Sequence, residues 1–399
     1  MIALSSKINT PISDQELQRR WTAVRSAMKQ QGIDVLLMQN NNDHMGGYVK
    51  YFTDLPAANG YPVTVVFPKD DGITLVRQGP FGGDQRVPPE GDGVLRGVTR
   101  VLTSPSFASA PFTKHYDAEL ASRALEPYVN QTVGLVGTAQ MPFALVDYLK
   151  KNRFSKTEFV DASQMVDGIK VLKSEEELAL IRMTAAMQDQ AMAAAFAAVR
   201  PGRKDSDIAA VAQHVGQELG SEQGIYLCAS APPGTPCMFG PRHYQNRTIQ
   251  KGDQFVLLIE NNGPGGFYTE LGRTCVLGKV DRKLQDEFAF TLHAQQFAVD
   301  LLQPGASCAD VWDAYNAFMR KNGRPEEQRL FCHGQGYDLV ERPLVRHDES
   351  MRIEKNMNIV VHPTYVKGDL MSWVCDNYII GSDGRVRRIH EYPQEILAL

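Results

Sequence analysis

The first third of the chain alternates helical and strand-like patterns of apolar residues. Residues 15–31 carry apolar side chains at helical spacing and end at Gly32, which predicts an amphipathic helix. Short apolar runs typical of buried strands occur at 33–38, 61–67, 73–77, 132–136 and 157–160. Because strands separated by helical segments are typical of a compact α/β domain, we expect one over residues 1–165.

The remainder of the chain contains an internal repeat. Ser174, followed three residues later by Glu177, predicts a capping box at the start of an Ala- and Met-rich helix. Residues 199–208 match residues 302–311 at a constant offset (302 − 199 = 103), and both contain Pro-Gly between two helical patterns. A chance recurrence of Pro-Gly is the alternative explanation. We expect an α+β domain over 166–399 whose two similar halves pack face to face around a pocket.

Composition and charge exclude several classes of protein. The 399 residues contain 42 Lys+Arg and 46 Asp+Glu, giving a net charge of −4, with no basic domain of the kind that binds nucleic acid. No apolar run approaches the roughly 20 residues that span a bilayer. The N-terminal segment resembles neither a signal peptide nor an anchor, so we expect a cytoplasmic protein. The six cysteines fit no disulfide or zinc pattern and are expected to be mostly buried thiols.

Two carboxylates occupy a predicted hairpin. Glu260 ends the apolar run 255–259, a glycine-rich turn follows at 263–266, and Glu270 returns on the partner strand. Opposite positions on one hairpin allow the two side chains to share a site. There, burial and mutual repulsion raise a pKa, or a cation binds both groups.

Two histidines and a cysteine lie in the other strand-like stretches. His333 is flanked by apolar residues and followed by Gly334 and Gly336, which allow backbone to approach a ligand closely. His362 and Cys375 stand at strand ends. A lone histidine in such a setting is more often a buried, hydrogen-bonded core residue than a catalyst.

The motifs, taken in order, resemble the pita-bread superfamily of creatinase, aminopeptidase P, prolidase and methionine aminopeptidase. The segments that carry this resemblance are Gly252-Asp253, Arg273-Thr274, His333-Gly334-Gln335-Gly336 and Glu341-Arg342-Pro343. The resemblance implies a creatinase-like N-terminal α/β domain over 1–165 and a pita-bread catalytic domain over 166–399.

The chain departs from the peptidases of this superfamily at the metal site. The resemblance implies two metal ions held by Asp, Asp, His, Glu and Glu. The residues at the matching positions are Glu260, Glu270, His333, His362 and Cys375. Each Glu is one methylene longer than Asp, so both carboxylates would overreach a cage for two ions roughly 3.5–4 Å apart. We therefore expect no dinuclear peptidase site.

The resemblance to creatinase and ectoine hydrolase implies a hydrolase that cleaves a C–N bond of a small polar nitrogenous compound: an amidine, an amide, or a cyclic amide or imine. We expect it to work without metal or cofactor. Glu260 would act as nucleophile or general base, and His333 would move protons while Glu270 or Glu341 orients it. The other candidate residues are His362 in the catalytic set and Arg242, His243, Arg247 and Cys375 at the substrate.

Three alternatives remain open. His333, His362, Cys375 and one or both glutamates would instead hold one transition metal in a mononuclear lyase or hydrolase. The second alternative is an Xaa-Pro peptidase, and the third is a binding protein without catalytic activity. The resemblance also implies a homodimer, because creatinase-like relatives lend N-terminal residues to the neighbouring pocket. Tyr61 is the candidate donor for that role.

Overall fold

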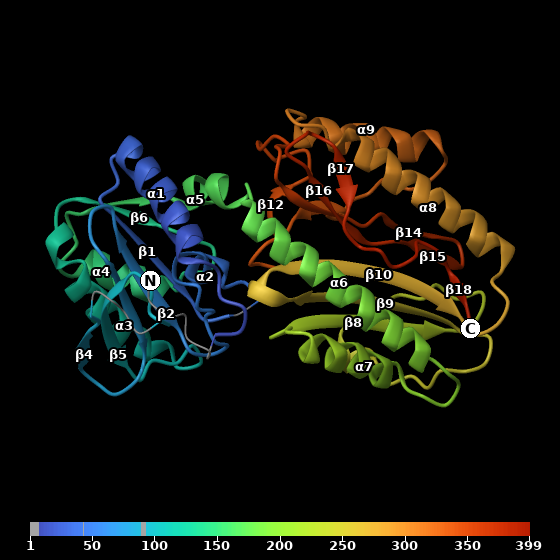
Figure 1. The fold of residues 1–399 in the computed structure, drawn as a ribbon, viewed down its shortest axis with the longest axis horizontal. Coiled ribbons are helices and arrows are strands. Elements are labelled where there is room, and N and C mark those ends of the chain that lie inside the picture. The colour runs from blue at the N-terminus through green and yellow to red at the C-terminus, as the bar shows by residue number, and fades with distance from the viewer. Residues whose placement is uncertain (1–7, 43, 89–92) are drawn as a thin grey trace. The chain divides into compact units, whose positions relative to one another are not determined.

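The chain forms two compact units in the computed structural model, which describes residues 8–42, 44–88 and 93–399. Unit 1 ends at Lys170 and unit 2 begins at Val171 (Figure 1). The expected domain boundary near residue 165 falls inside α5 (Ser163–Lys170), the last helix of unit 1. Within the described residues, no helix combines the length and the apolarity needed to cross a membrane.

Unit 1 is built on a seven-stranded sheet in the order β4-β5-β3-β2-β1-β6-β7. Its strands are β1 (Val35–Asn40), β2 (Val63–Pro68), β3 (Ile73–Gln78), β4 (Gly83–Arg86), β5 (Val98–Ser104), β6 (Thr132–Leu135) and β7 (Glu158–Asp161). Its other helices are α1 (Asp14–Gln31), α2 (Gly47–Thr53), α3 (Lys114–Ala124) and α4 (Phe143–Lys151). Helix α1 ends at Gly32 in the left-handed conformation, as predicted.

Unit 2 begins with two helices and a sheet. These elements are α6 (Glu175–Ala198), α7 (Asp205–Glu218), β8 (Gly224–Ala231), β9 (Gln254–Asn262) and β10 (Tyr268–Val276). The capping box of Ser174 and Glu177 is present at the start of α6. Helices α6 and α7 lie against one face of this sheet (Figure 1) and bury its apolar side chains.

The second half of unit 2 repeats this arrangement. Its elements are α8 (Arg282–Leu301), α9 (Cys308–Lys321), β11 (Cys332–Gly334), β12 (Glu341–Leu344), β13 (Asn358–Val361), β14 (Thr364–Lys367), β15 (Leu370–Trp373), β16 (Asp376–Ile380) and β17 (Val386–Arg388). The last strand, β18 (Leu397–Ala398), returns to the first sheet, where it pairs in parallel with β10. A five-stranded sheet in the order β12-β11-β13-β16-β17 packs against α8 and α9.

Equivalent hydrogen bonds confirm the internal repeat. The turns between α6 and α7 and between α8 and α9 place Gly202 and Gly305 at φ values of 89° and 91°, where a side chain would be strained. The Gly202 N–H donates to the Ile249 carbonyl at 2.9 Å, and the Gly305 N–H donates to the Ile353 carbonyl at 2.7 Å. The pseudo-twofold α+β architecture predicted from the sequence is therefore confirmed.

Candidate functional site

Glu260 and Glu270, called the carboxyl pair below, lie directly opposite one another on the antiparallel strands β9 and β10. Both strands are buried along their whole length. Ile259 and Leu271 point into the core beneath α6 and α7. Because neighbouring side chains alternate between the faces of a strand, the carboxyl pair projects from the other face. The predicted hairpin thus brings two carboxyl groups to one buried site.

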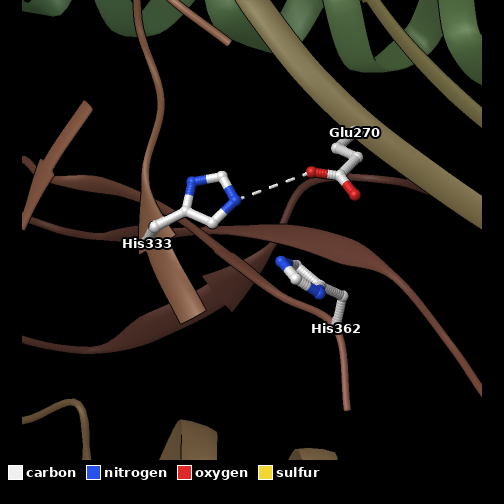
Figure 2. A group of neighbouring side chains, drawn as sticks. All are labelled: Glu270, His333 and His362. Atoms are coloured by element: carbon white, nitrogen blue, oxygen red, sulfur yellow. Dashed lines mark ion pairs between the residues drawn. The ribbon is translucent and has the colours of Figure 1, made fainter. Parts of the chain in front are cut away.

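The second half of unit 2 adds two histidines to this site. His333 comes from β11, and His362 directly follows β13. A carbonyl oxygen only accepts hydrogen bonds, so the contact of 2.9 Å between His333 Nδ1 and the Gly334 carbonyl places the ring proton on Nδ1. The Nε2 lone pair therefore faces Glu270 Oε2, 3.8 Å away (Figure 2).

Three potential ligand atoms converge at this point. One potential ligand atom each from Glu270, His333 and His362 lies within 4.8 Å of the other two (Figure 2). His362 Nε2 is buried and has no hydrogen-bond partner among the described residues. Facing lone pairs repel each other, so this arrangement is favourable only when a proton or a cation lies among them.

Burial shifts the pKa values of these groups toward their neutral forms. It raises the pKa of the Glu270 carboxyl to about 7. Burial, followed by the charge of Glu270, raises the pKa of Glu260 well above its ordinary value. Burial also lowers the pKa of His333 to about 4 and that of His362 well below its ordinary value. Both imidazoles are therefore uncharged at neutral pH.

Gln335 links the carboxyl pair, and the sequence did not identify it as a site residue. Its side-chain NH₂ donates to Glu260 Oε1 at 3.3 Å and to Glu270 Oε2 at 3.4 Å. Asn377 donates in turn to Gln335 Oε1 at 2.9 Å. Both amide side chains are fully buried. A glutamine between the two glycines that follow His333 was the only available sequence signal for this role.

Two further predicted residues take supporting positions. Glu341 accepts the Tyr337 N–H at 2.8 Å and pairs with Lys173 Nζ at 3.0 Å, which holds the turn after β11. Glu270 is the carboxylate placed to orient His333. The Cys375 thiol donates to the Glu270 backbone carbonyl at 3.4 Å, and burial raises its pKa well above the ordinary value. Cys375 is thus a protonated thiol beside the carboxyl pair.

The predicted substrate-side residues other than Cys375 lie in other places. Arg242 and His243 form a short 3₁₀ turn and line a cavity of about 350 Å³ beside α7 and β8. Arg247 pairs with Asp253, Nη2 to Oδ1 at 3.0 Å, and its expected role as a clamp for a substrate carboxylate stays a prediction. Tyr61 belongs to unit 1, where it is 47% exposed and its ring centroid lies 6.0 Å from that of Phe107.

A pseudo-twofold α+β unit with acidic and imidazole groups buried between its halves is the architecture of an enzyme of the pita-bread superfamily. The signature of metallopeptidase family M24 matches residues 179–390, more than half of the chain, so the chain belongs to this family of hydrolases.

Relatives within this family have different activities. A Sinorhizobium fredii protein described as an uncharacterized hydrolase/peptidase is 26% identical over 359 residues, 86% of each chain. The creatinase of a Bacillus species is 22% identical over 377 residues, 90% of this chain and 84% of the creatinase. The prolidase structure from Pyrococcus horikoshii has a TM-score of 0.74 and 18% identity, and the match covers 95% of this chain and all of the prolidase. The prolidase likeness shows the shared fold.

The family name implies metal, and the residues present fit one ion better than two. Two imidazole nitrogens and a carboxylate oxygen form a donor set that binds zinc or iron. His333 also donates its other ring N–H to a backbone carbonyl, as metal-binding histidines commonly do. Within the described part of the chain, Glu270, His333 and His362 form the only such group. Glu260 and Cys375 lie outside this group, so the geometry favours one ion over two.

Proposed function

We propose that the chain is a hydrolase that cleaves a C–N bond in a small, polar, nitrogen-containing compound by proton transfer at the carboxyl pair and His333. The observation that carries this proposal is the direct cross-strand pairing of Glu260 with Glu270, beside an imidazole whose free nitrogen faces Glu270. Acid and base groups within reach of one bond are what hydrolysis of an amide or amidine requires.

The proposed chemistry assigns a role to each group. In its ionised form, Glu260 accepts a proton from water as the water oxygen bonds to the substrate carbon. The C–N bond then breaks, and the leaving nitrogen takes the proton that Glu260 accepted, relayed through Glu270 and His333. The buried wall excludes other water, which strengthens the electrostatic interactions within the site. Arg242 and His243 remain proposed contacts for a polar part of the substrate.

The cluster of Glu270, His333 and His362 favours a second candidate function, a hydrolase or lyase that uses a single metal ion. These three residues would hold the ion, which would supply a Lewis acid and an activated water. Glu260 would keep its role as proton acceptor. Xaa-Pro peptidase activity, the activity of several relatives, is the third possibility that the assay below includes.

The test compares substrates and metal content in one preparation. The protein is dialysed against EDTA, its metals are measured by mass spectrometry, and amine or ammonia release is followed with creatine, cyclic amidines, lactams and Xaa-Pro dipeptides. We expect cleavage of a small amidine or amide by metal-free protein. Activity that appears only with about one bound metal per chain would establish the second candidate, and metal-dependent dipeptide cleavage would establish the peptidase.

Glu260→Gln is the decisive variant because it keeps the size of the side chain and removes the proton acceptor. We expect kcat to fall by about 10² to 10⁴-fold while the fold is retained. Glu327→Gln is the matched control, since Glu327 is as buried as Glu260, at 8% exposure each. Near-normal turnover by Glu260→Gln, or an equal loss in Glu327→Gln, would remove Glu260 from the mechanism.

A further inference from the structure

We propose that Asn377 is a positioning residue: it fixes the orientation of the Gln335 amide so that the NH₂ group, and not the carbonyl, faces the carboxyl pair. This inference rests on the proposed function only in that the carboxyl pair is proposed to perform the chemistry. The orientation of the Gln335 amide follows from a chain of hydrogen bonds that starts at the backbone N–H of Glu270.

The backbone N–H of Glu270 sets the orientation of Asn377. A backbone N–H can only donate, and this one donates to Asn377 Oδ1 at 2.7 Å. The NH₂ group of Asn377 must therefore point to the other side. There it donates to Gln335 Oε1 at 2.9 Å and to Asn358 Oδ1 at 3.1 Å.

Asn377, together with the Leu339 carbonyl, sets the orientation of Gln335. Because Gln335 Oε1 accepts from Asn377, its NH₂ group lies on the opposite side of the amide. That NH₂ group donates to both members of the carboxyl pair and, at 2.9 Å, to the Leu339 carbonyl. A reversed amide would place two NH₂ groups face to face and an oxygen against carboxylates. Bulk solvent does not reach either side chain, since Gln335 and Asn377 are both 0% exposed, so such contacts would be costly.

The fixed amide keeps a donor aimed at negative charge before any substrate arrives. Donors that need no reorientation during the reaction stabilise charge more effectively than mobile ones. One NH₂ group reaches both carboxyl groups, so it supports whichever of them is ionised at a given step. Asn377 contacts neither carboxyl group and acts through Gln335, which makes it a positioning residue rather than a catalytic one.

Two variants of buried asparagines separate this role from general stability. Asn377→Asp keeps an acceptor for the Glu270 N–H but replaces the NH₂ group with an oxygen that faces Gln335 Oε1. Asn358→Asp is the matched control. It keeps the oxygen that accepts from Asn377 and removes only the donor to the Gln335 backbone carbonyl, a bond of 3.1 Å. Both variants introduce one buried acid into the same cluster.

The kinetic test uses the substrate found for the proposed function. We expect kcat of Asn377→Asp to fall about 10- to 100-fold, the effect typical of lost supporting contacts, with KM changed by less than about threefold. Asn358→Asp should retain kcat near the wild-type value. Equal losses of kcat in the two variants would overturn the proposal.

A second readout needs no substrate. The side-chain amide ¹⁵N–¹H resonances of Gln335 are assigned by their absence in Gln335→Glu. We expect them to shift in Asn377→Asp and to stay in place in Asn358→Asp; unmoved resonances in Asn377→Asp overturn the inference. A wild-type protein that cleaves no C–N substrate would refute the proposed function, while this measurement still decides the positioning role.

Neutron diffraction of deuterated wild-type protein covers the case in which Asn377→Asp fails to fold. Deuterons on the Gln335 atom that faces the carboxyl pair would support the inference. Deuterons on the atom that faces Asn377 would overturn it.

Discussion

Arg273 is a fully buried residue that ties β10 to the C-terminal segment. Its guanidinium pairs with Asp376, Nη2 to Oδ1 at 2.6 Å, and both side chains are 0% exposed. It also donates to the Pro393 carbonyl at 2.7 Å and to the Tyr392 carbonyl at 3.0 Å. Because Arg273 lies three residues after Glu270 and its partner Asp376 directly follows Cys375, Arg273 supports the strands that carry the site.

Arg273→Met should destabilise the protein strongly. It removes the fully buried cation of the Asp376 carboxylate and leaves Arg388, 29% exposed and with Nη1 3.5 Å from Oδ1, as a weaker partner. Breaking a buried pair costs about 3–5 kcal/mol. The control is Arg282→Met, which removes an ion pair to Asp286 whose side chains are 91% and 72% exposed. Exposed pairs contribute about 0–1 kcal/mol. Urea denaturation of the two variants measures the difference, and equal unfolding free energies would contradict the structural role of Arg273.

At the level of elements, the segment after β17 returns to β16 and α6 through His390. This side chain is 2% exposed; its Nδ1 accepts the Asn377 N–H at 3.2 Å, and its Nε2 donates to Gln188 Oε1 at 2.9 Å. Burial lowers the pKa of His390 to about 3, although the nearby Asp376 carboxylate opposes the shift. Arg273 and Arg388, the other charged neighbours, lower the pKa further.

This shift predicts the sign of a pH dependence. Below the ordinary pKa of 6.5, the unfolded chain binds a proton at His390 that the folded chain refuses until about pH 3. The contribution of His390 to stability is therefore complete above pH 6.5 and declines as the pH falls through this window, by up to about 1.4 kcal/mol per pH unit. His390→Asn keeps an acceptor for the Asn377 N–H and does not titrate. Its unfolding free energy, measured in urea from pH 7 to pH 4, should fall less steeply than that of the wild type; parallel curves would contradict the assignment.

The elements that the sequence predicted are those that a local pattern of residues specifies. The capping box at Ser174, the two Pro-Gly turns and the β9–β10 hairpin each follow from local patterns, and each is present. Strand β4 was not predicted because its four residues, Gly-Asp-Gln-Arg, carry no hydrophobic signal. It exists through pairing with β5, where Arg100 Nε donates to Asp84 Oδ1 at 2.9 Å. Such an edge strand is specified by its partner.

The same distinction applies to the candidate site. The hairpin pattern predicted that Glu260 and Glu270 share a site, and the family resemblance implied that His333, His362 and Cys375 join them. Gln335 and Asn377 were not predicted, since amide side chains are common and their role depends on which neighbour they meet. The pairing of Glu341 with Lys173 links positions 168 residues apart, and no local pattern encodes it.

At the scale of the whole molecule, we propose a homodimer in which Tyr61 of one copy serves the site of the other. Tyr61 is 47% exposed at the edge of a surface cavity of about 510 Å³ that Arg77 and Gln78 also line. An exposed tyrosine beside a cavity is a common feature of contact surfaces. Sedimentation should give twice the chain mass of 44.3 kDa.

Mixed dimers test whether Tyr61 acts across the two copies. Tyr61→Ala and Glu260→Gln are each expected to be nearly inactive alone. If Tyr61 serves the neighbouring site, a dimer that contains one copy of each variant has one intact site, made of Glu260 from the first copy and Tyr61 from the second. Random exchange at equal concentrations then restores roughly a quarter of the wild-type activity, because half of the dimers are mixed and each has one working site of two.

If Tyr61 acts within its own chain, or if the protein is a monomer, mixing the two variants restores no activity. Full activity of Tyr61→Ala by itself would remove Tyr61 from the site altogether.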